Sequence, residues 1–65
     1  MPQILKEELK EQILSAAKKE FLTKDFQNAS IRNIAKSLSC SAGNIYNYFE
    51  NKYALFLATV QETIS

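Results

Sequence analysis

Apolar positions in the middle of the chain recur at the spacing of one helix face. Ile31, Ile34, Ala35 and Leu38 fall at i, i+3, i+4 and i+7, so they share one side of a helix. Ser30 directly precedes them and can cap that helix, and no proline interrupts it. The pattern therefore predicts a short amphipathic helix that begins at Ile31 and ends at Leu38.

A second short helix is expected after a break of three residues, from about Ala42 to Tyr48. Its apolar residues, Ile45 and Phe49, repeat at i, i+4. Poor helix formers occupy other positions of this segment: Gly43, Asn44 and Asn47. Recognition of a partner would explain this loss of local stability. Two short helices joined by a tight turn form a helix-turn-helix, whose second helix enters the DNA major groove, and we predict this motif over about residues 30–49.

A longer helix is predicted before this pair. It starts near Pro2 to Ile4, with proline tolerated in the first turn, and ends near Lys24. Its inward stripe consists of Leu9, Ile13, Ala16, Ala17 and Phe21. A short linker follows, and we expect its apolar residue, Phe26, to fill the core where the chain turns into the next helix.

The predicted last helix begins at Lys52 behind an Asn51 cap and reaches about Ile64. At about 100° per residue its apolar side chains fall on two sides. One side holds Tyr53, Phe56, Leu57, Val60 and Ile64, and the other holds Ala54, Leu55 and Ala58. A helix at the edge of a small bundle needs one buried face. The second face is expected to meet a regulatory domain or a second protomer, unless it wraps around its own bundle.

Composition excludes several classes of function. The chain has no His and one Cys, so neither a metal site nor a Ser-His or Cys-His catalytic pair can be built. We therefore expect no enzymatic activity and no cofactor. The N-terminus lacks the apolar core of a signal peptide, which favours a reducing cytoplasm. Association of the first helix with a membrane is disfavoured because acidic residues balance its lysines.

Charge is distributed unevenly along the chain. A net charge of +1 argues against an indiscriminate nucleic-acid binder, which would be strongly basic. Within residues 30–49, however, Arg32 and Lys36 are accompanied by no acidic residue. The predicted helix-turn-helix is thus free of negative charge where a phosphate backbone would lie.

A longer pattern of positions extends from about Leu9 to Val60. It comprises Ile13, Ala16, Ala17, Phe21, Ile34, Ala35, Leu38, Ser41, Gly43, Ile45, Tyr46, Tyr48, Phe49, Lys52 and Leu55. This pattern resembles the DNA-binding signature of the TetR family of bacterial transcriptional repressors. Where the family usually has glycine, this chain has Ser39 and Asp25. Both positions are expected to take a left-handed backbone at a small cost in stability.

The resemblance implies an all-α, homeodomain-like helical bundle in which a helix-turn-helix is followed by the start of a connecting helix. It implies that residues 1–65 are a DNA-binding domain and that a C-terminal domain for ligand binding and dimerisation lies outside them. The expected function is repression of transcription by a homodimer on a palindromic, double-stranded operator. A small-molecule inducer is expected for the full-length protein. An alternative is a helical module whose 42–48 surface binds another protein, and the steep salt dependence of phosphate contacts would distinguish the two.

The candidate DNA-binding residues are Ser30, Arg32, Ser41, Ala42, Gly43, Asn44, Tyr46, Asn47, Tyr48 and Lys52. Arg32 suits bidentate contact with guanine or phosphate, and Asn44 suits adenine. Gly43 would let the backbone approach the DNA, and Ala42 could meet a thymine methyl group. Each also has a purely structural interpretation, as a solvated side chain, a local cap or a helix-start residue.

The other candidates are assigned to the edges of the interface. Ser41 is expected to cap the recognition helix, and Asn47 could touch a base or the backbone. The resemblance implies that the hydroxyl groups of Tyr46 and Tyr48 donate to phosphates. Lys52 is expected to grip a phosphate together with the N-terminus of the last helix, because the helix dipole otherwise disfavours a cation there.

Overall fold

The computed structural model describes residues 6–64, and it describes the side chains of residues 8–61. The chain forms four helices in this range: α1 (Lys6–Thr23), α2 (Ile31–Ser37), α3 (Ala42–Tyr46) and α4 (Lys52–Ile64). No strand occurs among the described residues, so the prediction of an all-α fold is confirmed. The predicted start of the first helix, near Pro2 to Ile4, lies outside the described residues.

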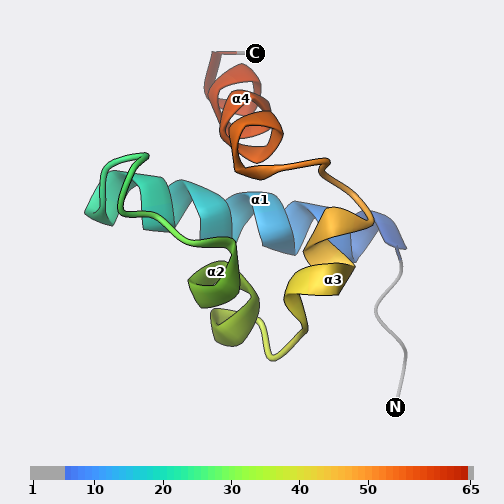
Figure 1. Cartoon of the computed structure of the whole chain (residues 1–65). Coiled ribbons are helices and arrows are strands. Elements are labelled where there is room, and N and C mark those ends of the chain that lie inside the picture. Colours follow the sequence, from blue (N-terminus) through green and yellow to red (C-terminus); the bar gives the residue numbers. More distant parts are fainter. Residues whose placement is uncertain (1–5, 65) are drawn as a thin grey trace.

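The central element of the bundle is α1, which packs against both α2 and α4 (Figure 1). In this view α2 and α3 lie below α1, and α4 rises above it. The helix-turn-helix pair is held together by packing of α2 against α3. Consequently α2 and α3 form one end of the molecule, and α4 leaves from the other.

Every helix contributes one large side chain to the centre of the core. The largest fully buried side chains are Ile13 of α1, Ile34 of α2, Ile45 of α3 and Leu55 of α4. Around them lie smaller or less deeply buried residues: Leu14, Ala17, Ile31, Ala35 and Phe49. The apolar stripes predicted for the first three helices are confirmed, and Leu14 is an additional core residue of α1.

The core side of α4 is the smaller of its two apolar sides. Leu55 and Thr59 are buried, whereas Tyr53 is 59% exposed and Leu57 is 41% exposed. The Asn51 cap is confirmed, because its Oδ1 accepts a hydrogen bond from the Ala54 N–H at 2.8 Å. The exposed side of α4 therefore carries large apolar groups that do not contribute to this core.

Two expectations about the loop between α1 and α2 are wrong. Phe26 does not fill the core: it is 36% exposed, and its ring lies 6.0 Å from that of Phe21, measured between centroids. The buried side chain of the loop is Ala29. Asp25 does not have a left-handed backbone, since Ser39 is the one non-glycine residue with positive φ in the described part of the chain. Instead, Asp25 Oδ1 accepts hydrogen bonds from the backbone N–H and side-chain amide of Asn28, both at 2.9 Å, which turns the loop with ordinary backbone angles.

Candidate nucleic-acid interface

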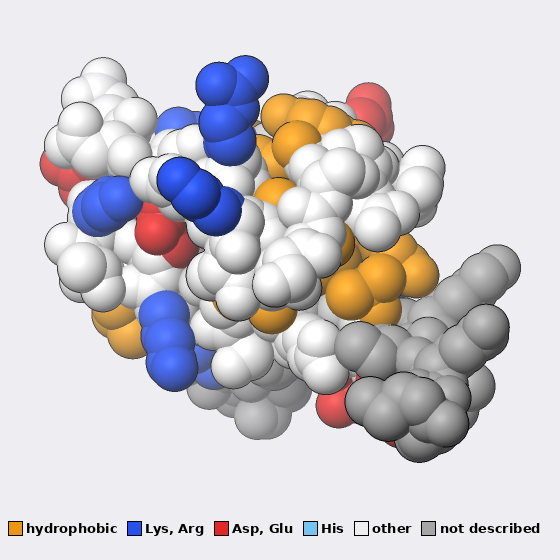
Figure 2. Space-filling model, turned by 90° about the horizontal axis from the view of Figure 1, so that it is seen from below, with side chains coloured by type: hydrophobic (Ala, Val, Ile, Leu, Met, Phe, Trp, Pro, Cys, Tyr) orange, Lys and Arg blue, Asp and Glu red, His pale blue; other side chains and the backbone are white. Residues whose placement is uncertain are grey.

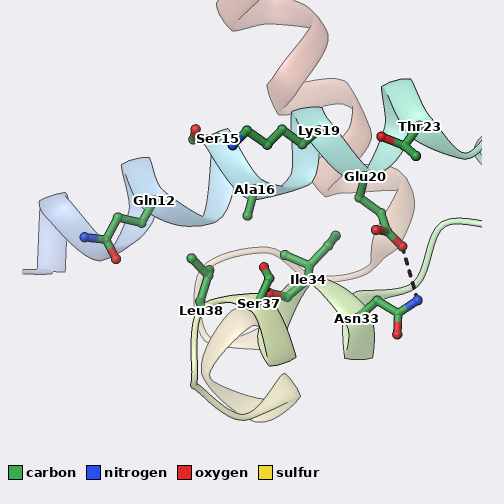
Figure 3. A pocket seen from close by; sticks show the side chains of 10 residues that line it. All are labelled: Gln12, Ser15, Ala16, Lys19, Glu20, Thr23, Asn33, Ile34, Ser37 and Leu38. Carbon is green, nitrogen blue, oxygen red and sulfur yellow. Dashed lines mark hydrogen bonds between the residues drawn. The ribbon is translucent and has the colours of Figure 1, made fainter.

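The start of α2 is fixed by two hydrogen bonds that meet at Ser30. The Ser30 hydroxyl accepts from the Asn33 N–H at 3.3 Å, which confirms the predicted cap. The Ser30 N–H in turn donates to Glu20 Oε2 on α1 at 3.1 Å. Figure 3 shows Glu20 reaching down to Asn33, whose side-chain amide donates to the same oxygen at 3.5 Å. A carboxylate is favourable beside the positive end of a helix, so Glu20 clamps α2 to α1.

The turn between α2 and α3 closes through its own backbone. The Cys40 N–H donates to the Ala35 carbonyl at 3.0 Å, and the Ser39 N–H donates to the Lys36 carbonyl at 3.2 Å. These are the two bonds of a Schellman motif, in which one residue must be left-handed. That residue is Ser39, with φ of 57°, and the expectation of a left-handed backbone is confirmed there. The turn sets the angle at which α3 leaves α2.

Only one face of α3 contributes to the core. The Ser41 hydroxyl accepts from the Asn44 N–H at 3.2 Å, which confirms the predicted cap. Ile45 is fully buried, whereas Tyr46 is 50% exposed. The helix ends at Tyr46 rather than at Tyr48, because the Tyr48 N–H bonds to the carbonyl three residues back instead of four. Despite its five residues, α3 is therefore held by the Ser41 cap at its start and by the burial of Ile45.

The predicted contact residues divide into two groups by exposure. The exposed group consists of Arg32, Ser41, Gly43, Asn44, Tyr46 and Asn47. The half-buried group consists of Ser30, Ala42, Tyr48 and Lys52. Ala42 and Tyr48 pack partly against the core, so their side chains serve the fold as well as the surface. The outer surface of α3 thus offers amide and phenol groups without any charge.

Gly43 is not required by the fold. Its φ is not positive, and a β-carbon built on it would meet only Ser41 Oγ, at the ordinary contact distance of 3.7 Å. A helix of this length would be more stable with alanine at that position. The absence of a side chain there consequently has no explanation inside the domain.

A shallow groove of about 470 Å³ lies beside α3. Its polar lining includes Arg32 from α2, Tyr46 from α3 and Lys52 from α4. The groove therefore brings together three predicted contact residues from three helices. A cation and a phenol at one edge of a helix-turn-helix are suited to hydrogen bonding with phosphate oxygens.

Lys52 has an intramolecular environment that the sequence did not indicate. Its Nζ donates to the carbonyl oxygens of Phe26 at 2.7 Å, Ala29 at 3.0 Å and Gln27 at 3.4 Å. It also lies 4.5 Å from the centroid of the Phe26 ring, within the range of a cation–π contact. The predicted contact with a phosphate stays a prediction, and these four interactions compete with it.

The charge pattern separates α2 from α3. Figure 2 views the face that carries both helices: the basic side chains lie on the α2 half, with some acidic atoms among them, and the α3 half is mainly uncharged, with several hydrophobic side chains exposed. From residue 30 to residue 49 the charged residues are Arg32 and Lys36 alone. Cations beside an uncharged polar surface suit a partner whose charge lies at the edge of the contact rather than in its centre.

A second groove, of about 400 Å³, lies along the junction of α1 and α2 and is shown in Figure 3. Its walls carry mainly uncharged polar groups such as Gln12, Ser15 and Ser37, with Glu20 bonded to Asn33 at one end. No cluster of residues that could hold a metal ion occurs in the described part of the chain. Among those same residues, no helix is both long and apolar enough to cross a membrane.

A comparison with known protein families agrees with this arrangement. The family model described as bacterial regulatory proteins, tetR family, matches residues 13–59, which comprise most of the chain. Among the described side chains, the matched range runs from the first buried residue of α1 to the last buried residue of α4. No curated protein and no solved structure matches the chain. The chain belongs to the tetR family of bacterial regulatory proteins, which are DNA-binding regulators of transcription.

Proposed function

We propose that this regulator represses transcription by placing α3 in the major groove of an operator half-site. The observation that carries the proposal is the outer surface of α3, where exposed amides adjoin a glycine that the fold does not need. A core or an ordinary solvated surface would not favour exposed amides beside a dispensable glycine. A recognition helix would favour them, because its backbone approaches base edges.

Base contacts are assigned to the first turn of α3. Asn44 is exposed and pairs with adenine through N6 and N7, while Ala42 meets a thymine methyl group. Gly43 lets the backbone between them approach the groove. Asn47, one turn later, contacts a base edge or the backbone. Because α3 has no arginine or lysine, the commonest partners of guanine, its direct readout is proposed to favour A·T pairs.

Phosphate contacts are assigned to the rim of this surface. Arg32 and Tyr46 line the groove beside α3 and are both exposed, so they can reach one strand of the duplex. Ser30 and Tyr48 are half-buried, and their hydroxyl groups are assigned to the phosphate backbone of the same DNA strand. Ser41 holds the N-terminus of α3 in place through its cap. These contacts fix orientation and leave sequence discrimination to α3.

One domain of this size supplies few contacts, so the operator is proposed to be palindromic and bound by two protomers. Exposed apolar groups on α4, chiefly Tyr53 and Leu57, are consistent with further protein lying on that side. In the proposal a C-terminal domain supplies the dimer and responds to a small-molecule inducer. Fusion of residues 1–65 to an unrelated dimeric protein is expected to raise the affinity for a palindromic site well above that of the monomer.

The decisive experiment is selection of duplexes from a randomised pool by the dimeric fusion, followed by titration of variants at several salt concentrations. Asn44→Ala is expected to cost about 1–3 kcal/mol on the selected site and to relax the preference at one base pair. Gly43→Ala is expected to raise stability by about 0.5–1 kcal/mol while weakening DNA binding. Gln61→Ala, which removes an exposed amide from α4, is the control and should leave binding unchanged.

Three outcomes would contradict the proposal. Selection that yields no preferred sequence would exclude specific readout by α3. Tight binding by Asn44→Ala with unchanged base preference would move the readout elsewhere. Binding of another protein through residues 42–48, with weak dependence on salt, would favour the interaction module instead.

A further inference from the structure

We infer that Lys52 is a positioning residue: its ammonium group holds the loop between α1 and α2 against the first turn of α4, and thereby fixes α2 relative to α4. In this role the ammonium stays on backbone carbonyls and does not grip a phosphate. This role of Lys52 belongs to the architecture of the domain and does not depend on which partner the domain binds.

The geometry satisfies every donor that a lysine possesses. An ammonium group has three N–H bonds, and Lys52 Nζ lies within hydrogen-bond distance of the carbonyl oxygens of Phe26, Gln27 and Ala29. The shortest of these contacts, 2.7 Å to Phe26, is that of a charge-assisted bond. The Phe26 ring adds a fourth favourable contact from its face.

These contacts also resolve a local electrostatic conflict. A cation at the first residue of α4 is disfavoured by the positive end of the helix dipole. Three carbonyl oxygens of a neighbouring loop supply partial negative charge at the same place. Release of Lys52 would restore the conflict and would leave the carbonyl of Ala29, a residue that is 4% exposed, without this donor.

The contact joins elements whose main packing contacts run through α1. The main packing contacts connect α1 with α4, α1 with α2, and α2 with α3. Lys52 connects the first residue of α4 directly to Ala29, one residue before the cap of α2. Glu20 fixes that cap from α1 through Ser30. The start of α2, and with it the direction of α3, is thus defined by α1 on one side and by α4 on the other.

The unfolding measurements compare three variants of the full chain, and a fourth, Phe26→Leu, serves the NMR measurement. Lys52→Met keeps the aliphatic stem but removes charge and donors, and Lys52→Arg keeps both in a planar fork. Lys36→Met removes an exposed positive charge from α2 and is the matched control. Thermal unfolding is followed for each variant. In the wild-type chain, NMR records the ε-methylene protons of Lys52, which the Phe26 ring should shift upfield.

Lys52→Met is expected to lower the unfolding midpoint by at least about 4 °C, with substantial recovery in Lys52→Arg and no change in Lys36→Met. The upfield shift of the Lys52 ε-protons should disappear in Phe26→Leu and persist when DNA is bound. The slope of log K against log salt should be the same for Lys52→Met and wild type, because no phosphate contact is lost. If Lys52→Met does not fold, Lys52→Arg and the wild-type NMR shift decide the matter.

An unchanged midpoint for Lys52→Met, or an unshifted ε-proton signal, would overturn the inference. A salt slope reduced by about one unit would also overturn it, even beside a lowered midpoint, since the ammonium would then bind a phosphate. If the dimeric fusion of the wild-type chain binds no DNA, the proposed function fails, while the midpoints and the NMR shift still determine the role of Lys52.

Discussion

The two connections on either side of α2 are held in opposite ways. The longer one, between α1 and α2, is secured by side chains from outside it: Glu20 of α1 bonds to Ser30, and Lys52 of α4 bonds to three of its carbonyls. The shorter one, between α2 and α3, closes through two backbone bonds of its own and places Ser39 in a left-handed conformation.

The comparison shows where stability in so small a domain can be lost and where it can be gained. The long connection depends on partners that are distant in the sequence, so removal of one partner residue costs several interactions at once. The short turn depends on one backbone angle that serine tolerates poorly and glycine adopts freely. Substitutions far from the long loop should therefore damage it, whereas a single local substitution should improve the short turn.

The largest effect is expected for Glu20→Ala. This change leaves the Ser30 N–H without its acceptor and removes the side-chain link between α1 and the start of α2, at a cost of about 1–3 kcal/mol. Urea unfolding monitored by circular dichroism measures the loss. The control is Glu8→Ala, an exposed acid on the same helix, which should change stability little. Equal effects of the two substitutions would show that Glu20 is not a clamp.

Removal of the cap that follows the short turn should have the next largest effect. Ser41→Ala deprives the Asn44 N–H of its acceptor and is expected to cost about 1 kcal/mol. Ser41→Asp retains a capping oxygen, so it should keep the stability of the wild type while adding negative charge beside the proposed DNA contact. Thermal unfolding and DNA titration of both variants separate the two effects. A stable Ser41→Ala variant would mean that α3 does not depend on its cap.

Ser39→Gly is expected to increase stability by about 0.5–1 kcal/mol, because glycine pays no steric cost at φ of 57°. Ser37→Gly, within α2, is the control and should destabilise by about 0.5 kcal/mol. The gain at Ser39 should add to the loss in Glu20→Ala within about 0.5 kcal/mol, since the two sites share no hydrogen-bond partner. A destabilised Ser39→Gly variant would remove the basis of the comparison.

Asp25→Ala should have the smallest effect, about 0.5 kcal/mol, because the hydrogen bonds that it breaks are exposed to water. The amide of Asn28 should exchange with solvent faster, while the Lys52 contacts keep the rest of the loop closed. Hydrogen exchange followed by NMR measures the local change. A loss as large as that of Glu20→Ala would show that the loop is organised from within.

Local features of the fold were predictable from the sequence, and long-range ones were not. The caps at Ser30, Ser41 and Asn51 and the left-handed Ser39 depend on neighbours within five residues, and all were predicted correctly. The position of the Phe26 ring, by contrast, is set by contacts with aromatic side chains of α1 and α4. No spacing rule along the chain connects such distant partners.

The same distinction applies to the candidate site. Exposure of Asn44 and Asn47 follows from helix periodicity once Ile45 is assigned to the core, so the surface could be derived from the sequence. The contacts of Glu20 and Lys52 could not, because each joins residues at least ten positions apart. For α4 the sequence offered two apolar sides, and only packing against α1 determined which is buried. The base and phosphate contacts themselves stay predictions.

The bond from Lys52 to the Phe26 carbonyl spans 26 residues, and this has a consequence for the order of folding. During synthesis, α1, α2 and α3 leave the ribosome before α4 does, and the local contacts between α2 and α3 can form first. The loop ahead of α2 lacks its Lys52 contacts until α4 has emerged, and the core lacks Leu55 until then. A nascent chain that ends before α4 therefore has α2 and α3 without the contacts of Lys52 and Leu55 that complete their placement.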